Sequence, residues 1–167
     1  MTTTGHAQHP DGHGAVEPQH GEPRVDDRVN DRVADLFAAA RAAQSNAHAP
    51  YSGFRVGAAV CSESGTIYAG ANVENAAYPQ GWCAEASAIA AMVSAGERRI
   101  TAVLTVADGE MLATCCGGCR QKIREFAGPD TPIHACGPAG LRVTFTLAEL
   151  LPQSFGPESL GVDAPVS

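Results

Sequence analysis

The stretch CAEASAIAAMVSAGERRITAVLTVA, residues 83–107, decides the fold that we predict for this chain. Its first part is rich in helix-forming residues and reaches Gly96, a residue type that commonly ends a helix. Its last part, 100–107, is an apolar run of the kind found in strands that are covered on both faces. The stretch therefore predicts a helix followed by a central strand of a layered domain.

The segments on either side continue this alternation of helices and strands. The predicted elements are an amphipathic helix over 25–40, a hairpin over 55–73, a helix over 116–128, strands over 132–136 and 141–145, and a short helix over 147–151. Helices and strands that alternate in this order favour an α/β fold. We expect a three-layer α/β/α sandwich around a mixed sheet of about five strands.

Composition and charge narrow the range of partners. The 167 residues suit one ordinary domain, with 44% apolar residues, 17% charged residues and a net charge of −7. The arginines are scattered and form no basic run, so we expect neither nucleic acid nor an anionic membrane surface as a partner. Neither a signal peptide nor an apolar run that could span a bilayer is evident, and we expect a cytoplasmic protein.

We predict that the folded domain covers residues 25–159. The segment before it, 1–24, holds four of the six histidines among Gly, Pro, Thr and Gln and has almost nothing apolar to bury. We interpret this segment as a disordered tail, although its histidines could bind stray divalent metal. Residues 160–167 are predicted to form a flexible C-terminal tail.

Three cysteines lie at the starts of two predicted helices. Cys83 begins one helix, and Cys116 and Cys119 begin the next. In a reducing cytosol, clustered cysteines indicate metal binding or catalysis before they indicate disulfides. The first turn of a helix favours anions, and cysteines three positions apart share one helix face. Three thiolates from two helices would form a zinc site whose fourth position is open to water.

Glu85 lies two residues after Cys83 and suggests a catalytic use of such a site. A carboxylate that does not bind the metal is the acid–base group that a zinc-activated water needs. Cys-x-Glu followed about thirty residues later by Cys-x-x-Cys is the spacing of zinc-dependent nucleobase deaminases. A lone Cys-x-x-Cys also occurs in structural zinc sites, where Cys115 could be a fourth ligand.

The chain resembles the small cytidine deaminases in four segments. These are PYSGFRVGAAV (50–60), NVENAAYPQGWCAEASAI (72–89), CGGCRQ (116–121) and LAELLPQSF (147–155). The resemblance covers about residues 25–159 and implies a cytidine deaminase-like fold and a homotetramer. It implies hydrolytic deamination of cytidine and 2′-deoxycytidine to uridine and 2′-deoxyuridine with release of ammonia, a reaction of pyrimidine salvage on a small-molecule nucleoside.

The same resemblance implies roles for individual residues. The zinc ligands would be Cys83, Cys116 and Cys119, with one ion in each subunit. Glu85 would shuttle protons while zinc-bound hydroxide attacks C4 of cytosine. The substrate contacts would be Phe54 on the pyrimidine ring, Asn72 and Glu74 on the ribose hydroxyls, Ala84 in the pocket, and Tyr78 and Phe155 at a boundary shared with a neighbouring subunit.

Two positions depart from the pattern of that family. Cys115 stands where the family usually has proline, and Ala86 stands where many members have arginine. The missing arginine would have offset part of the thiolate charge. We therefore expect Arg120 or Gln121, which directly follow Cys119, to supply part of the compensation next to its sulfur.

Other functions fit parts of the same pattern. One is a deaminase of a blasticidin-type antibiotic or of a modified cytosine, although the segment NVENA, 72–76, favours an ordinary ribose or deoxyribose. Another is a zinc-stabilised binding domain without activity, but structural zinc needs no carboxylate such as Glu85 beside its cysteines. A nucleic-acid editor is disfavoured by the acidic charge and by the lack of an aromatic and basic channel pattern.

Overall fold

The computed structural model describes Met1 and residues 25–161, with side chains from Asp31 onward. Apart from Met1, Leu160 and Gly161, the tails predicted over 1–24 and 160–167 lie outside the described residues, and those predictions stay predictions. Among the described residues, no helix has both the length and the hydropathy needed to cross a bilayer.

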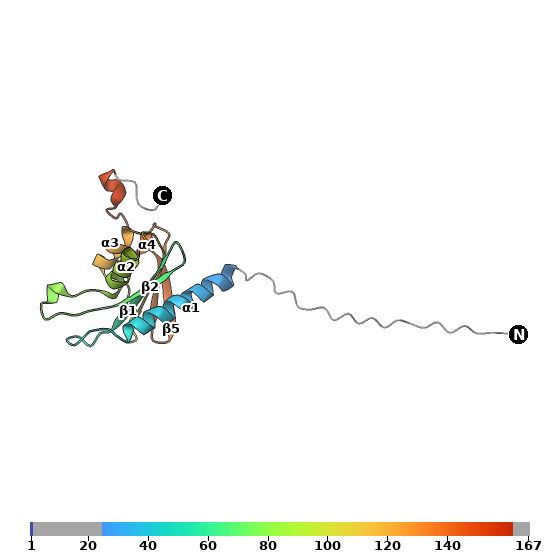
Figure 1. Ribbon diagram of the computed structural model, residues 1–167, viewed down its shortest axis with the longest axis horizontal. Helices are drawn as coiled ribbons and strands as arrows, with labels where there is room; N and C mark the ends of the chain where they lie inside the picture. The colour runs from blue at the N-terminus through green and yellow to red at the C-terminus, as the bar shows by residue number, and fades with distance from the viewer. Residues whose placement is uncertain (2–24, 162–167) are drawn as a thin grey trace.

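Helices and strands alternate along the described chain (Figure 1). They are α1 (Val25–Gln44), β1 (Val56–Ser62), β2 (Ile67–Ala71), α2 (Ala84–Ser94), β3 (Ile100–Ala107), α3 (Gly117–Arg124), β4 (Pro132–Gly137), β5 (Gly140–Thr146) and α4 (Leu147–Leu150). Two short 3-10 helices, η1 (Tyr78–Gln80) and η2 (Pro157–Leu160), complete the set. The sequence patterns did not indicate these two helices, because a single turn has no apolar periodicity to detect.

One predicted helix is shorter than expected. Helix α3 ends at Arg124, whereas the sequence predicted a helix over 116–128. The chain turns after α3 because Phe126 packs against the core and its carbonyl accepts a 2.8 Å hydrogen bond from the Ile100 amide. This bond ties the end of α3 to the start of β3.

The strands form one five-stranded sheet in the order β2-β1-β3-β4-β5. Strand β1 pairs antiparallel with both β2 and β3, and β5 pairs antiparallel with β4. Strands β3 and β4 run parallel, because α3 forms the crossover between them. The predicted mixed sheet of about five strands is thereby confirmed.

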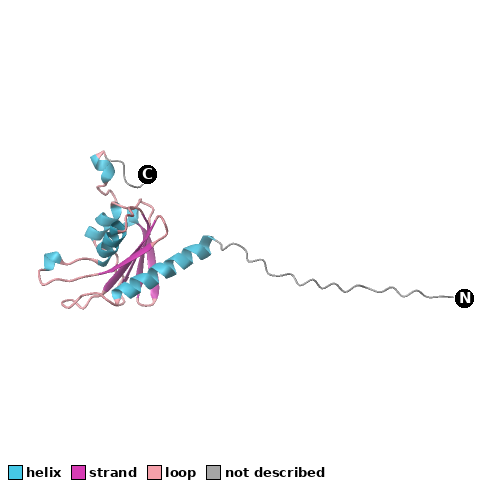
Figure 2. Cartoon of the chain, viewed as in Figure 1, coloured by secondary structure: helices cyan, strands magenta, loops and turns pink. Residues whose placement is uncertain are grey.

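Helices cover both faces of this sheet (Figure 2). Helix α1 packs against one face, which includes Ala59, Leu104 and Val106. Helices α2 and α3 pack against the other face, which includes Val60 and Val103. Successive residues of a strand point to opposite faces, so Ala59 and Val60 belong to different cores. The α/β/α layering predicted from the apolar strand is confirmed.

Two glycines allow the helices to lie close to the sheet. A Cβ atom at Gly57 in β1 would overlap the carbonyl oxygen of Ala40 in α1. A Cβ atom at Gly70 in β2 would lie 2.5 Å from both the Ala88 amide nitrogen and the Ser87 Cβ atom in α2. The depth at which α2 packs matters for function, because the N-terminus of α2 carries residues of the candidate site.

We predict that Gly70→Ala lowers the free energy of unfolding by about 1–3 kcal/mol, the usual cost of overpacking. Two of the three nearest atoms belong to the α2 backbone and the third is the Ser87 Cβ atom, so none can move aside without displacing the helix. Gly128→Ala is the control, because a Cβ atom at Gly128 would meet open space and change stability by less than about 1 kcal/mol. Urea unfolding compares the two variants, and equal midpoints would contradict the prediction.

Candidate functional site

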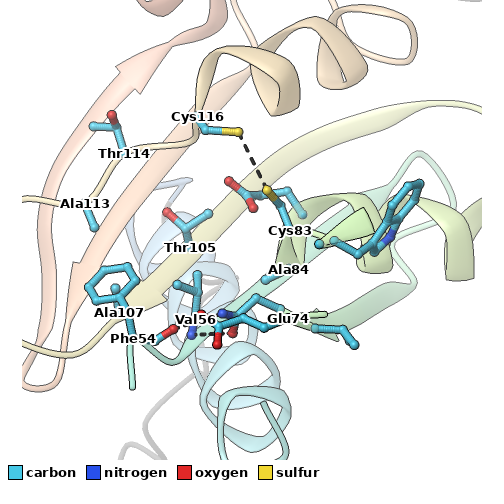
Figure 3. A pocket seen from close by; sticks show the side chains of 15 residues that line it. Phe54, Val56, Glu74, Cys83, Ala84, Thr105, Ala107, Ala113, Thr114 and Cys116 are labelled. Carbon is cyan, nitrogen blue, oxygen red and sulfur yellow. Dashed lines mark hydrogen bonds between the residues drawn. The ribbon is translucent and has the colours of Figure 1, made fainter. Parts of the chain in front are cut away.

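Three cysteine sulfurs converge where α2 and α3 begin. Cys83 is the N-cap residue of α2, Cys116 is the N-cap residue of α3, and Cys119 lies in the first turn of α3. All three sulfurs lie within 4.8 Å of one another, and the Cys83 and Cys116 sulfurs are 3.7 Å apart (Figure 3). Tetrahedral zinc with bonds of about 2.3 Å would hold its sulfurs about 3.8 Å apart, so the geometry fits such an ion.

The three thiols differ in acidity. Burial raises the pKa of Cys83, and the neighbouring Cys116 thiol raises it further. Burial also raises the pKa of Cys119, and the negative charge of Glu85 adds to this effect. For Cys116, burial is outweighed by hydrogen bonds from Cys119 and Cys83, which leave its pKa lowered. A bound cation would hold all three as thiolates, because metal coordination deprotonates a thiol.

Glu85 is a buried carboxylate close to these sulfurs. It lies in the first turn of α2, and only 5% of the residue is exposed. Burial, followed by the charge of Glu85 and a hydrogen bond to it, raises the pKa of the Cys115 thiol. A buried carboxylate beside a metal site can accept a proton in one step and donate it in the next.

Cys115 lies apart from the three convergent sulfurs. Among the described residues, the group of possible metal ligands contains Cys83, Cys116 and Cys119 but not Cys115. Cys115 is 1% exposed and packs in the core beneath α2 and α3. The position next to the three cysteines therefore holds a buried thiol outside the group of possible ligands.

A pocket of about 320 Å³ opens in front of the sulfurs and Glu85. Figure 3 shows its wall, in which Cys83 and Cys116 face each other across from Phe54 and Val56. The lining residues are Phe54, Val56, Asn72, Val73, Glu74, Gly81, Trp82, Cys83, Ala84, Glu85, Thr105, Ala107, Ala113, Thr114 and Cys116. Apolar walls with a few polar groups are typical of sites that bind small organic molecules.

The predicted contact residues Phe54 and Asn72 lie together in this pocket. The Asn72 side chain accepts a 2.8 Å hydrogen bond from the Val56 amide and donates a 2.9 Å bond to the Phe54 carbonyl. Asn72 thus fixes the segment that carries Phe54 to the end of β2. Phe54 is 46% exposed, so it lines an open wall instead of filling the core.

Glu74 lies at the edge of the same pocket and is held by a neighbouring loop. Its carboxylate accepts hydrogen bonds from the Ser52 hydroxyl and from the Tyr51 and Ser52 amides. The hydrogen bond from the Ser52 hydroxyl, followed by that from the Tyr51 amide, lowers the pKa of the Glu74 carboxyl. Glu74 therefore presents a fixed negative charge at the pocket edge.

Two predicted contact residues, Tyr78 and Phe155, do not line the pocket of their own chain. They are 75% and 60% exposed. The Tyr78 ring meets the Tyr51 ring edge to face, with centroids 5.9 Å apart. Ala84, by contrast, lies in the pocket wall between Cys83 and Glu85.

Arg120 and Gln121 stabilise the segments around α3. The Arg120 guanidinium donates to the Cys115 and Leu150 carbonyls, each at 2.8 Å, and to the Thr114 hydroxyl at 3.0 Å. The Gln121 amide donates to the Phe155 carbonyl at 2.9 Å. These hydrogen bonds go to atoms other than the Cys119 sulfur, so the charge compensation expected from both residues stays a prediction.

The sequence patterns missed several residues of the pocket wall. Thr105 lies inside the apolar run of β3, Thr114 lies in the loop before α3, and Trp82 directly precedes Cys83. The Lys122 ammonium, in the last turn of α3, lies 5.9 Å from the centre of the Trp82 ring and links α3 to the segment just before α2. A polar residue on a strand face that is otherwise buried was the one available signal for Thr105.

Fold and site together define a class of protein, an α/β/α domain with a three-cysteine metal site beside a buried carboxylate. Residues 31–135 match the cytidine and deoxycytidylate deaminase zinc-binding region. The chain belongs to the cytidine and deoxycytidylate deaminase family.

Individual relatives agree with this assignment. The chain is 43% identical over 129 residues to the cytidine deaminase of Sporosarcina psychrophila, a match that covers 77% of this chain and 95% of the relative. The crystal structure of cytidine deaminase from Burkholderia pseudomallei is similar, with a TM-score of 0.68 and 35% identity over 73% of this chain and 98% of that chain. The Mycobacterium leprae cytidine deaminase structure gives a TM-score of 0.60 and 42% identity, over 72% and 97% of the two chains.

We predict that Cys119→Ala lowers zinc affinity strongly and that Cys115→Ala hardly changes it, although both thiols are fully buried. Cys119→Ala removes a ligand. It should lower zinc affinity by more than the roughly 10–100-fold that is lost when a residue that only hydrogen-bonds a ligand is removed. Cys115→Ala should leave affinity within a few-fold of the original, because its sulfur lies outside the ligand group. Competition with a chromogenic chelator measures both, and equal losses would contradict the assignment.

Proposed function

We propose that the protein catalyses hydrolytic deamination of cytidine and 2′-deoxycytidine, which yields uridine, 2′-deoxyuridine and ammonia. The observation that carries this proposal is the Glu85 carboxylate, buried beside three convergent sulfurs in the wall of a largely apolar pocket. That arrangement joins the ligands of an open metal site to a group that can transfer protons. Membership of the deaminase family supports the same reaction.

We assign zinc as the metal, with Cys83, Cys116 and Cys119 as its ligands and one ion in each subunit. Thiolates are ligands that zinc favours, and three protein ligands leave the fourth position that catalytic zinc requires. When bound, zinc would supply a water of pKa about 7, and hence a nucleophile at neutral pH. The sulfur spacing of 3.7 Å between Cys83 and Cys116 supports this choice.

Glu85 would move the protons of the reaction. It would accept the proton that the attacking water loses and deliver it to N3 of cytosine, which makes C4 more electrophilic. It would then pass the hydroxyl proton at C4 to the exocyclic amine, so that ammonia leaves and the uracil carbonyl remains. Burial of Glu85 supports this role, because it limits exchange of these protons with bulk water.

The substrate would lie with its base along the apolar wall and its sugar at the polar edge. Phe54 and Ala84 would contact the pyrimidine ring, and Asn72 and Glu74 would bind the ribose hydroxyls. The Asn72 amide uses one donor and one acceptor site on backbone groups and keeps one of each for a ligand. Its fixed orientation supports this assignment, because a held amide loses little entropy on binding.

We predict that Glu85→Gln lowers kcat by at least about a hundredfold, the scale of general acid–base catalysis. The amide has the same shape but cannot carry a proton, so zinc content and melting temperature should stay close to the original. Glu125→Gln, at an exposed position just after α3, is the control and should keep full activity. Loss of cytidine absorbance measures turnover, and a fully active Glu85→Gln variant would refute the proposed mechanism.

We also propose that each active site is completed by a second copy of the chain within a cytoplasmic homotetramer that serves pyrimidine salvage. The exposure of Tyr78 and Phe155 supports a shared boundary, because large exposed aromatic residues are enriched in interfaces. Their absence from the pocket of their own chain is consistent with a role in the pocket of a neighbour.

We predict that light scattering finds four chains per particle and that Phe155→Ala raises KM for cytidine. Phe155 packs no buried core in its own chain, so the variant should fold with a nearly unchanged melting temperature. A wild-type protein that is fully active as a monomer would contradict the shared site.

A further inference from the structure

Thr105 carries a buried hydroxyl in the wall of the pocket. The residue lies in β3 and is 3% exposed, and its Oγ1 atom has no hydrogen-bond partner among the described residues. Figure 3 shows Thr105 between Cys83 and Cys116 on one side and Phe54 and Val56 on the other. The hydroxyl therefore belongs to the deep part of the pocket, close to the proposed reacting centre.

Besides the Thr105 hydroxyl, one other buried side-chain atom of the described domain lacks a partner, the Nε atom of Arg55, whose guanidinium still donates through a terminal nitrogen to the Ser45 carbonyl. The remaining buried polar side chains have partners. Gln44 donates to the Arg55 carbonyl at 2.8 Å, and Ser62 donates to the Thr66 carbonyl at 3.1 Å. His134 shares a 2.8 Å hydrogen bond with the Thr144 hydroxyl, and Glu85 interacts with the Cys115 thiol. Thr105 differs from Arg55 because the hydroxyl is its only polar side-chain atom, so the side chain is wholly unpaired. Buried polar groups without a partner are rare enough in proteins to need a reason.

Packing does not supply that reason. Thr105 pairs with Ala58 of β1 and Ala135 of β4, and Val103 lies two residues before it on the same face of the sheet. Valine would have the same branched shape, would suit a strand equally well and would not leave a hydroxyl unpaired. A threonine here thus costs stability in the free protein, as expected of a group that a ligand satisfies.

We propose that the Thr105 hydroxyl is a further substrate contact, which hydrogen-bonds the polar edge of the pyrimidine base and positions its ring in front of Glu85. The inference rests on the proposed function, because the base is its ligand. A hydroxyl can rotate and both donate and accept, so it can pair with the amino group of cytosine or with a ring or carbonyl acceptor. This hydrogen bond forms only in the complex with the substrate, so the Thr105 hydroxyl is unpaired in the free chain.

The test compares the same substitution at two positions of one strand. Thr105→Val removes the pocket hydroxyl, and Thr105→Ser keeps it. Thr101→Val is the matched control, because the exposed Thr101 hydroxyl donates to the Cys61 and Ser62 carbonyls, each at 3.2 Å, and does not line the pocket. The measurements are kcat/KM for cytidine, the melting temperature, and calorimetric binding of cytidine in a Glu85→Gln background.

We expect Thr105→Val to lower kcat/KM and cytidine affinity by about 5–10-fold, the effect of one lost hydrogen bond, at an equal or higher melting temperature. Thr105→Ser should keep most of the kcat/KM and most of the cytidine affinity. Thr101→Val, in contrast to Thr105→Val, should lower the melting temperature and leave kcat/KM unchanged.

Two results would overturn the inference. One is wild-type kcat/KM in Thr105→Val, and the other is a stability loss in Thr105→Val that equals or exceeds that of Thr101→Val, because the hydroxyl would then be structural. A wild-type protein that neither binds nor converts cytidine would instead reject the proposed function, and the two failures are thereby distinguished.

Discussion

The site depends on one constraint, the close approach of the N-termini of α2 and α3. Cys83 reaches the sulfurs of Cys116 and Cys119 only because both helices pack on the same face of the sheet. Gly70 lets α2 lie close to β2, and the buried Ile123 anchors α3 in the same core. The helix N-termini add their partial positive charge where negative ligands gather. Hydrophobic packing thus sets the distances between the three sulfurs on which metal binding would rely.

The pocket combines apolar walls with a few polar groups, and burial strengthens the electrostatic interactions of these groups. Electrostatic interactions are stronger in such an environment than in water, so the proton transfer proposed for Glu85 and the hydrogen bond proposed for the Thr105 hydroxyl would both gain from it. The loops that form the pocket edge are held by side chains, with Asn72 bound to the backbone around Phe54 and Glu74 bound to the turn at Ser52. A ligand would meet a surface that is already ordered, and little entropy would be lost in arranging it.

Much of the fold followed from local patterns in the sequence. The apolar run of β3 required other elements to cover both of its faces. The helical periodicity of the segments before and after it indicated that these elements are helices. The three-residue spacing of Cys116 and Cys119 places them on one helix face in any fold that keeps the helix. The mixed sheet, its layering and the position of Cys83 and Glu85 at a helix start could therefore be predicted before the structure.

The sequence by itself determined the elements and the residues at their ends, because these depend on neighbours along the chain. The resemblance selected Cys116 and Cys119 over the adjacent Cys115, and tertiary packing supplies the physical reason, because Cys115 is buried in the core whereas Cys116 is exposed. Tertiary packing also decided that Thr105 faces the pocket, that Arg120 bonds to the loop before α3, and that Tyr78 lies outside the pocket. These outcomes depend on contacts between segments far apart in sequence, and periodicity carries no information about such contacts.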